Sequence, residues 1–316
     1  MSDVTRFIFH LPGSVLRQQA DMKPYYVKLT TGLAARGYEV QLALHDRDTL
    51  AKDVAADDDF HIVDHGNLRH PRVLNTGIAY LYPFWNLDPW GIRALSSISE
   101  KSFDPNVLDM DAATAFAKRL RKRWVALRKS RYDQPTRPAM SPGDCIAVFL
   151  QSEGQRGVME TCHLDLRALV KALLARSDPR PIVIKPHPLD ATPTTRRFLN
   201  RIAARDSRVR VIDGNIHDIL ARASLCVTIN SAVGIESMLH GVPVVLCGKT
   251  DFHHCAVTVT DPKGMDAGIA LAQMTAWPHD AFLYWYFGLN CLNAGRDGLV
   301  DDFLIRVSAT GFRLNP

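Results

Sequence analysis

Short apolar runs alternate with stretches of helical period along the first part of the chain, and they predict its strands and helices. The apolar runs predict strands over residues 5–11, 40–44 and 60–63. Between the first two strands, Tyr25, Leu29 and Leu33 fall on one face of a predicted helix that ends at Gly37. A strand, a helix and a second strand in this order predict a parallel sheet with right-handed crossovers.

A second series of strands and helices begins after a segment that favours a domain boundary. Residues 130–144 contain three prolines and few apolar side chains. The strands expected after it lie over residues 145–150, 181–185, 209–212, 225–229 and 243–247. We therefore expect a first domain over residues 1–138, a second over 139–276, and C-terminal helices over 277–316 that cross back to the first domain.

Two further segments have a distinctive pattern. Residues 75–99 are aromatic and irregular, which predicts a structured functional loop. Residues 118–131 hold eight lysines and arginines and no acid, and Phe116, Leu120 and Trp124 fall at near-helical spacing. This pattern predicts a basic amphipathic helix. We favour packing of its apolar stripe on the core, and contact with an anionic membrane or an anionic lipid acceptor is the alternative.

Composition narrows the class of protein. The 316 residues are enough for two domains, and 47% hydrophobic with 22% charged residues is typical of a globular protein. No apolar run is long enough to span a bilayer, no secretory signal is recognisable, and the six cysteines form no CxxC motif. These features predict a cytoplasmic protein with reduced thiols. A net charge of +5 is too small to indicate a nucleic-acid partner.

The most informative motif follows the predicted strand 181–185. It reads Lys185-Pro186-His187-Pro188 and stands at the carboxyl end of the strand, where ligands bind in open α/β sheets. The prolines fix φ and hold the imidazole in a stiff turn. A stiff, partly cationic turn at that edge suits a phosphate group. The alternative is a proline-rich surface turn with no ligand.

A second motif follows the predicted strand 225–229. Asn230 or Ser231 is a good N-cap for a helix that runs to His240. Small residues at the start of that helix would expose amide groups and a positive dipole end, which favours an anion. An ordinary strand, turn and helix without a ligand is the alternative, so the motif gains weight from its pairing with the His187 turn.

These two motifs, together with the segment from Gly248 to Thr258, resemble the capsule polysaccharide biosynthesis family. Its best-known members transfer the acidic sugar Kdo from CMP-Kdo. A weaker similarity lies at Tyr80-Leu81-Tyr82-Pro83 and at Leu87-Asp88. The resemblance implies an α/β fold of the GT-B type, with two Rossmann-like domains facing a cleft, the first for the acceptor and the second for the nucleotide. The dinucleotide fingerprint GxGxxG is absent after the first strand.

The resemblance also implies roles for individual residues. His187 would contact the CMP phosphate, Ser231 and the amides after it would cradle the same phosphate, and Glu236 would hold the ribose hydroxyls. An alternative for Glu236 is a surface residue that interacts with the helix dipole. The implied donor-binding set is Lys185, His187, Pro188, Asn230, Ser231, Ala232, Glu236, Gln151, Glu153 and His253.

His253 and His254 invite a metal-site interpretation, which the sequence disfavours. Adjacent histidines on a strand would point to opposite faces, and no metal-ligand spacing accompanies them. The resemblance instead implies that one of them meets the sugar carboxylate.

The acceptor side departs from the family pattern. An acidic pair followed by glycine usually precedes the Tyr-Leu-x-Pro stretch, and this chain has Asn75-Thr76-Gly77 there. Asp88 is the nearest carboxylate in a matching context, so we expect Asp88, with His187, to be catalytic. An Asx turn before Pro89 is the alternative for Asp88, and Asp64 and His65 are alternatives for the catalytic role.

The sequence therefore predicts a glycosyltransferase that uses a CMP-activated, Kdo-like acidic sugar to build a capsular or surface polysaccharide or its lipid-linked base. Its expected partners are the nucleotide-sugar donor and a glycan or glycolipid acceptor, with no cofactor and no metal. One alternative is a CDP-glycerol-type phosphotransferase. Another is an inactive GT-B module that binds nucleotide or glycan within a capsule assembly complex, which the missing acidic pair motivates.

Overall fold

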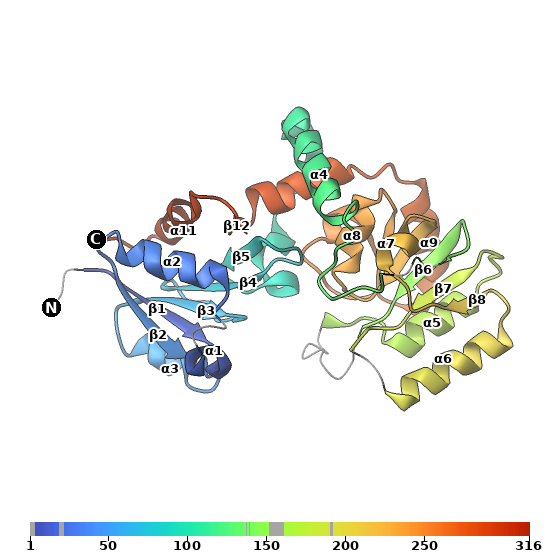
Figure 1. Cartoon of the computed structure of the whole chain (residues 1–316), viewed down its shortest axis with the longest axis horizontal. Coiled ribbons are helices and arrows are strands. Elements are labelled where there is room, and N and C mark those ends of the chain that lie inside the picture. The colour runs from blue at the N-terminus through green and yellow to red at the C-terminus, as the bar shows by residue number, and fades with distance from the viewer. Residues whose placement is uncertain (1–3, 19–21, 137, 139, 152–160, 190–191) are drawn as a thin grey trace. The chain divides into compact units, whose positions relative to one another are not determined.

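The computed structural model describes residues 4–18, 22–136, 138, 140–151, 161–189 and 192–316 (Figure 1). The chain forms two compact units. The first contains Met1–Lys101 and Tyr286–Pro316, and the second contains Ser102–Trp285. Each unit is built around its own six-stranded sheet.

The sheet of the first unit is mostly parallel. Its strands are β1 (Arg6–Leu11), β2 (Glu39–Leu44), β3 (Phe60–Asp64), β4 (Val73–Ile78), β5 (Phe84–Asp88) and β12 (Leu292–Asn293). They lie in the order β12-β5-β4-β3-β1-β2, with β1 to β4 parallel and the other two antiparallel to their neighbours. The order β2-β1-β3 places the topological switch point between β1 and β3.

Among its described residues, the first unit has four α-helices: α1 (Gly13–Arg17), α2 (Pro24–Ala34), α3 (Leu50–Ala55) and α11 (Leu299–Ser308). The predicted apolar face of α2 is buried, as expected from Tyr25, Leu29 and Leu33. α2 and α11 contact each other, and Phe303 of α11 reaches the same core as Phe9 of β1. The C-terminal helix is therefore part of the core of this unit.

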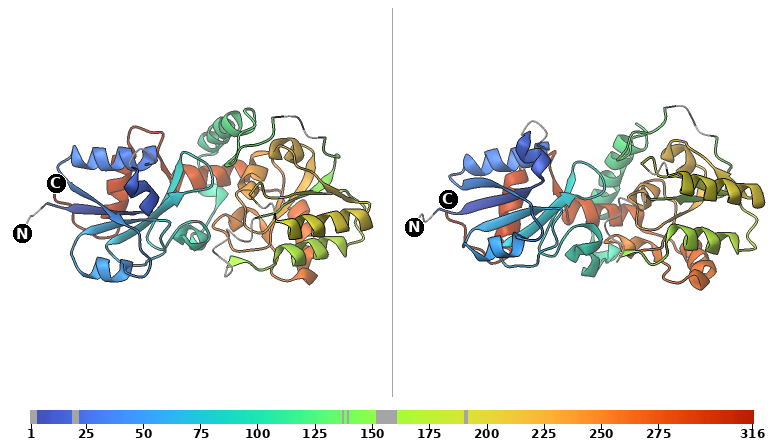
Figure 2. Two further views of the ribbon diagram at one scale, coloured as in Figure 1. Left: turned by 60° about the horizontal axis from the view of Figure 1, so that its bottom comes forward. Right: turned by 90° about the horizontal axis from the view of Figure 1, so that it is seen from below.

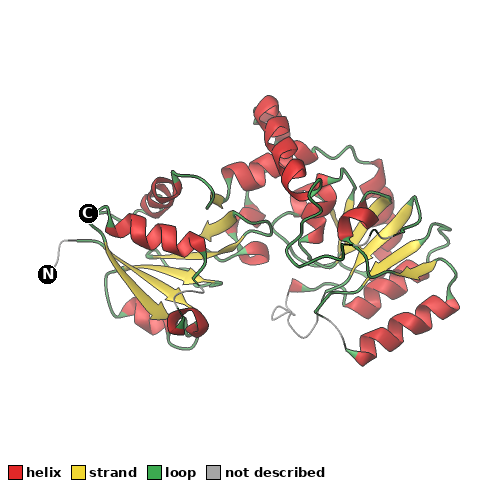
Figure 3. Ribbon diagram, viewed as in Figure 1, coloured by secondary structure: helices red, strands yellow, loops and turns green. Residues whose placement is uncertain are grey.

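The second sheet is parallel throughout. Its strands are β6 (Cys145–Phe149), β7 (Ile182–Lys185), β8 (Val209–Val211), β9 (Ala223–Thr228), β10 (Val244–Leu246) and β11 (Val257–Thr258). They lie in the order β11-β10-β9-β6-β7-β8, the doubly wound Rossmann order with its switch point between β6 and β9. All five strands that the sequence predicted here are confirmed (Figure 3).

The second unit also contains α-helices. They are α4 (Met110–Trp124), α5 (Leu166–Leu174), α6 (Pro193–Arg205), α7 (Ile216–Leu220), α8 (Val233–Leu239), α9 (Met265–Met274) and α10 (His279–Leu283). The views in Figure 2 show α5 and α6 along one face, and both helices contribute to one apolar core. A π-helix follows at Tyr284–Leu289. Short 3₁₀ helices lie at Arg93–Leu95, Ser97–Glu100, Pro105–Val107, His253–Cys255 and Pro262–Gly264.

The basic helix α4 differs from the expectation in two ways. It ends at Trp124 rather than reaching residue 131, so Leu127 is 59% exposed. Its apolar face, which includes Leu120 and Trp124, is buried, and α4 contacts α10 and α8. These contacts group α4 with the second unit, whereas the sequence-based boundary at residue 138 had assigned it to the first.

The interpretation of residues 75–99 as a loop is wrong for its first half, which holds most of β4 and all of β5. Buried polar side chains interrupt the apolar pattern by which strands are recognised in a sequence. Asn75 donates from Nδ2 to the carbonyl oxygen of Leu68 at 2.9 Å, and Thr76 donates to the carbonyl oxygen of Asn86 at 2.8 Å. These hydrogen bonds satisfy polar groups inside the sheet, so alternation of apolar and polar residues is lost.

Candidate functional site

Two amide side chains are paired at the switch point of the second sheet. Gln151 follows β6 and Asn230 follows β9, the two strands that flank that point. Gln151 Nε2 donates to Asn230 Oδ1 at 2.8 Å, and the backbone N–H of Asn230 donates to Gln151 Oε1 at 2.9 Å. Asn230 Nδ2 donates in turn to Thr161 Oγ1 at 3.1 Å. The structure thus brings together two predicted donor-site residues, where ligands bind in this fold.

The Lys185–Pro188 turn follows the next strand, β7. The backbone N–H of Leu189 donates to His187 Nδ1 at 3.1 Å, so the neutral imidazole carries its proton on Nε2. The ring of Tyr132 meets the His187 ring edge to face at a centroid distance of 5.1 Å. Lys185 is 4% exposed and its Nζ donates to Asp213 Oδ1 at 3.2 Å, so its charge is already paired. Pro188 is exposed at the end of the turn.

The turn before α8 differs in detail from the expected cap. Ala232 occupies the N-cap position, and no side chain caps the helix from that residue. Ser231 Oγ accepts instead from the backbone N–H of Val233 at 3.3 Å. α8 ends at Leu239, one residue before the expected end at His240, and Gly241 follows with a φ of +72°.

Glu236 is buried, at 1% exposure, rather than on the surface. Burial raises the pKa of its carboxyl to about 8, although a hydrogen bond from Ser130 opposes the shift. Its Oε1 has no hydrogen-bond partner among the described residues. The alternative of a surface residue beside the helix dipole is therefore wrong. A buried oxygen without a partner is uncommon in native proteins and is a candidate ligand contact.

The segment that contains Ser130 and Tyr132 links two predicted donor-site residues. Ser130 hydrogen-bonds to Glu236, and Tyr132 contacts His187. Sequence reasoning missed both residues, because this segment has the composition of a domain boundary. Thr161, which holds Asn230, was missed as well.

The two adjacent histidines lie in a 3₁₀ turn, His253–Cys255, and not on a strand. Their rings stack at 4.2 Å instead of pointing to opposite faces. His253 Nδ1 donates to the carbonyl oxygen of Thr250 at 2.8 Å. Among the described residues no group of three or more His, Cys, Asp or Glu could hold a metal ion. Glu153 lies outside the described residues.

Asp88 ends β5 in the first unit, and its carboxylate is occupied by hydrogen bonds. Its Oδ1 accepts from the backbone N–H groups of Trp90 at 2.8 Å, Gly91 at 3.3 Å and Ser97 at 2.9 Å. Its Oδ2 accepts from Ser97 Oγ at 2.6 Å, and Asp88 is 4% exposed. This geometry is that of the Asx turn that the sequence left open, and it favours a structural role over a catalytic one.

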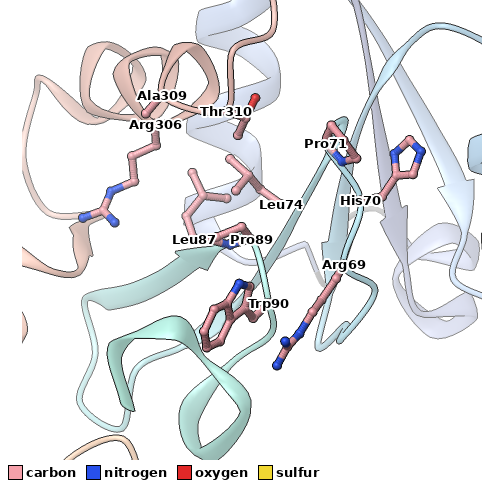
Figure 4. Close-up of a pocket in the computed structure, with 10 residues that line it drawn as sticks. All are labelled: Arg69, His70, Pro71, Leu74, Leu87, Pro89, Trp90, Arg306, Ala309 and Thr310. Carbon is pink, nitrogen blue, oxygen red and sulfur yellow. The ribbon is translucent and has the colours of Figure 1, made fainter. Parts of the chain in front are cut away.

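The loop that Asp88 holds forms one wall of a pocket in the first unit. The pocket has a volume of about 490 Å³, and Trp90, Arg69 and Arg306 are among its lining residues (Figure 4). The guanidinium of Arg69 lies over the Trp90 ring, 4.2 Å from its centroid. Arg69 precedes β4 and Trp90 follows the antiparallel β5, so the pocket lies at the amino edge of the parallel strands. Ligands of α/β sheets bind at the opposite edge.

Asp64 and His65, the alternatives for the catalytic role, stand at that opposite, carboxyl edge. Asp64 is the last residue of β3, next to the switch point of the first sheet. His65 Nδ1 lies 2.9 Å from Asp64 Oδ2. The structure therefore gives each unit polar side chains at its own switch point.

None of the helices in the described part of the chain is long and apolar enough to cross a membrane.

Comparison with known proteins gives a family match and a fold match. Residues 106–266, about half of the chain, match the model of a family described as capsule polysaccharide biosynthesis protein. The structure of the KpsC beta Kdo 2,7 transferase of Thermosulfurimonas dismutans is similar, with a TM-score of 0.58 at 14% identity over 98% of this chain and 100% of that chain. The beta Kdo 2,4 transferase of the same KpsC has a TM-score of 0.55 at 15% identity, over 95% and 97%. These matches confirm the fold of two Rossmann-like domains. A search of curated proteins found no match.

Proposed function

Because the chain belongs to the capsule polysaccharide biosynthesis family, we propose that it is a glycosyltransferase that takes an acidic, Kdo-like sugar from a CMP-activated donor. The acceptor is a glycan or a glycolipid. The observation that carries the proposal is the carboxyl edge of the second sheet. There Gln151 and Asn230 are paired at the switch point, and the His187 turn ends the neighbouring strand.

The His187 turn has the chemistry that a nucleotide phosphate requires. Because Nδ1 accepts from the backbone, the proton of the neutral ring is on Nε2, and an N–H donor of this kind suits a phosphate oxygen. Tyr132 restricts the ring from the side. The charge of Lys185 is paired with Asp213, so Lys185 contributes packing and a long-range field more than a direct contact. His187 is thus the main candidate for the phosphate contact.

Glu236 suits the ribose. Its buried Oε1 has no partner in the described chain, and Ser130 holds the carboxyl group. A ribose hydroxyl would satisfy that oxygen. Departure of CMP requires stabilisation of phosphate charge, and a hydroxyl acceptor requires a base, so the reaction needs no redox cofactor. Metal independence is part of the proposal.

Nucleotide preference tests the proposal first. We expect CMP and CDP to raise the unfolding temperature more than UMP, UDP or NAD at equal concentration, since only a bound ligand stabilises the folded state. Equal or greater stabilisation by UDP or NAD would contradict the proposed donor class.

Substitution of His187 tests the site itself. His187→Ala should weaken CMP binding by about 1–3 kcal/mol, the range for a hydrogen bond to a charged group, and leave the unfolding temperature nearly unchanged because the ring is only half-buried. Isothermal titration gives the affinity. His163→Ala, an exposed histidine of the same unit, is the matched control. If His187→Ala bound CMP with wild-type affinity, the Lys185–Pro188 turn would be an ordinary surface turn with no ligand.

Donor profiling separates the proposal from its alternatives. Transfer from CMP-Kdo or CMP-sialic acid supports it, whereas transfer from CDP-glycerol alone identifies a phosphotransferase. Asn75 and Thr76 are buried in β4 where the family carries acids, which favours an inactive binding module as the second candidate. Binding of CMP without turnover of any donor would select that candidate.

A peripheral membrane contact through α4 is also part of the proposal. Lys118, Arg119, Lys122 and Arg123 are exposed on this helix. Arg121 is paired with Asp280, so it contributes less to an outward positive surface. The four exposed cations suit an anionic lipid surface.

A further inference from the structure

The carboxyl end of β3 presents a carboxylate and an imidazole in contact. His65 Nδ1 lies 2.9 Å from Asp64 Oδ2. The side chain of Asp64 is 6% exposed and that of His65 is 38% exposed, so a buried carboxylate holds a ring that solvent reaches. With Nδ1–H donating to the carboxylate, the neutral ring has its lone pair on Nε2.

Several groups fix the carboxylate of Asp64. The hydroxyl of Tyr26, from the first turn of α2, donates to Asp64 Oδ1. Burial raises the pKa of Asp64, but the hydrogen bond from His65, the charge of His65 when it is protonated, the hydrogen bond from Tyr26 and the charge of Lys23 outweigh burial, and the pKa lies below its usual value. The carboxylate is therefore ionised at neutral pH. His45, from the loop after β2, hydrogen-bonds to the backbone of Asp64.

The backbone of His65 is unusual. Its φ is +53°, in the left-handed region that residues with a side chain seldom adopt. Its N–H donates to the carbonyl oxygen of Thr76 at 2.7 Å, which holds the residue in that conformation. Strained residues of this kind are concentrated at functional sites.

A second hydrogen-bonded group in the same unit, formed by His10, His61 and Asp57, has a purely structural role. His10 Nε2 lies 2.9 Å from His61 Nδ1, and His61 Nε2 lies 3.0 Å from Asp57 Oδ1. Both of these rings are at most 2% exposed. No substrate reaches them. The pair of Asp64 and His65 differs because its imidazole is accessible and stands beside the switch point.

We propose that His65 is the general base of the transfer reaction and that Asp64 and Tyr26 position it. The proposal rests on the proposed function and adds the acceptor-activating site, in the first unit, for a substrate that carries a hydroxyl group. In this proposal His65 has the catalytic role that the sequence analysis expected for Asp88, because the carboxylate of Asp88 already accepts hydrogen bonds from its own loop.

The acceptor hydroxyl gives its proton to His65 Nε2 as its oxygen forms a bond to the anomeric carbon of the donor sugar. The bond from that carbon to the phosphate oxygen breaks, and CMP leaves with the electron pair. Asp64 stabilises the imidazolium that forms, and the proton then passes to solvent. The general base accounts for a factor of about 10² to 10⁴ in rate.

One experiment needs no donor. In histidine-labelled full-length protein, long-range ¹H–¹⁵N correlation at a pH where the ring is neutral reports which nitrogen is protonated. We expect His65, assigned by loss of its signals in His65→Gln, to carry the proton on Nδ1, and Asp64→Asn to change that pattern. A proton on Nε2 in the wild type would overturn the proposal, because the ring could not then act as a base at the exposed atom.

Kinetics with the donor found by profiling complete the test. His65→Gln should lower kcat for transfer about 100-fold or more, with the KM for donor and the CMP affinity within about threefold of wild type. Asp64→Asn should lower kcat as well. His65→Gly removes the ring while fitting a φ of +53°, so its loss of activity cannot be attributed to backbone strain. His70→Gln, in the same unit at the amino edge, is the control and should retain activity.

The outcomes separate this proposal from the proposed function. A transferase whose His65 variants keep wild-type kcat overturns the assignment of His65 alone. If the wild type binds CMP but transfers from no nucleotide sugar, the proposed function fails and the catalytic role of His65 fails with it, whatever the tautomer. Loss of kcat in the His65 and Asp64 variants, with CMP affinity retained, supports both.

Discussion

At the scale of single residues, Asp88 shows how one carboxylate can determine the shape of a loop. Three backbone N–H groups and one hydroxyl donate to it, and the loop that they define carries Trp90. A buried acceptor with four donors leaves all four unsatisfied when it is removed, which is costly.

Asp88→Ala should therefore destabilise the protein by roughly 2–4 kcal/mol, since several buried donors lose their acceptor. Ser97→Ala removes one of the four hydrogen bonds and should cost about 1 kcal/mol. Urea unfolding measures both. CMP affinity should not change in either variant. A fall in transfer of 100-fold in Asp88→Asn, with stability unchanged, would restore Asp88 to the catalytic role that the sequence suggested.

Glu236 makes stability depend on pH. Burial raises the pKa of its carboxyl to about 8 in the folded protein, against 4.5 for an ordinary glutamate. The folded state thus binds the proton more tightly than the unfolded chain does. The stability that this proton contributes is complete below about pH 4.5 and is lost as the pH rises through 8.

Glu236→Gln keeps the size of the side chain and removes its ionisation. Its stability relative to wild type should therefore increase by roughly 3 kcal/mol between pH 5 and pH 8. Denaturant unfolding of both proteins at pH 5, 6.5 and 8 measures this difference, and other titrating groups cancel in the comparison. A difference that is constant with pH would show that Glu236 is ionised in the folded state.

At the scale of elements, α4 combines an apolar face that packs on the second unit with a row of exposed cations. Leu120 and Trp124 are buried, so the helix is part of the fold whether or not it binds lipid. Arg121 and Arg128 are engaged by Asp280 and Asp218. Their substitution would disturb the fold and would be a poor test of lipid binding.

Exposed cations provide the test. If α4 contacts anionic lipid, the wild type should sediment with vesicles that contain phosphatidylglycerol, and the bound fraction should fall as salt is raised. Replacing Lys118, Lys122 and Arg123 with Gln should abolish sedimentation and leave the unfolding temperature within about 2 °C. Replacing Arg196, Arg197 and Arg201 of α6 with Gln is the matched control. Wild-type sedimentation in the α4 variant would contradict a role for this helix.

At the scale of the whole molecule, the two units differ in how the chain builds them. The second unit is one continuous stretch, whereas the first needs the C-terminal residues to complete its core. Phe303 is fully buried, and its ring stacks on that of Phe9 at 6.3 Å. Without α11, this apolar face would be exposed to water.

Residues 102–285 expressed alone should therefore fold and bind CMP with an affinity close to that of the full chain. Residues 1–101 alone should be insoluble or molten, and fusion to residues 286–316 through a flexible linker should restore cooperative unfolding. Circular dichroism and isothermal titration report the outcome. Cooperative unfolding of residues 1–101 without the C-terminal segment would contradict the role assigned to α11.

The sequence by itself determined five strands of the second sheet, β6 to β10, and the place of the motifs that follow them. Its strands are continuous apolar runs, and each ends in a polar turn, so the carboxyl edge could be predicted from local pattern. The position of His187, in the turn after β7, could be predicted for the same reason. β4 and β5 were not predicted, because Asn75 and Asn86 are buried inside them and interrupt the apolar pattern.

Only the tertiary structure decided how distant residues combine. Gln151 and Asn230 meet across 79 positions because β6 and β9 are neighbours in the sheet, and strand order is not encoded in local periodicity. The same holds for the choice between the two carboxylates of the first unit. Asp88 and Asp64 both end strands, but the surroundings of Asp88 occupy its oxygens, whereas Asp64 orients an accessible histidine. That difference depends on contacts between segments, which residue types and spacing do not specify.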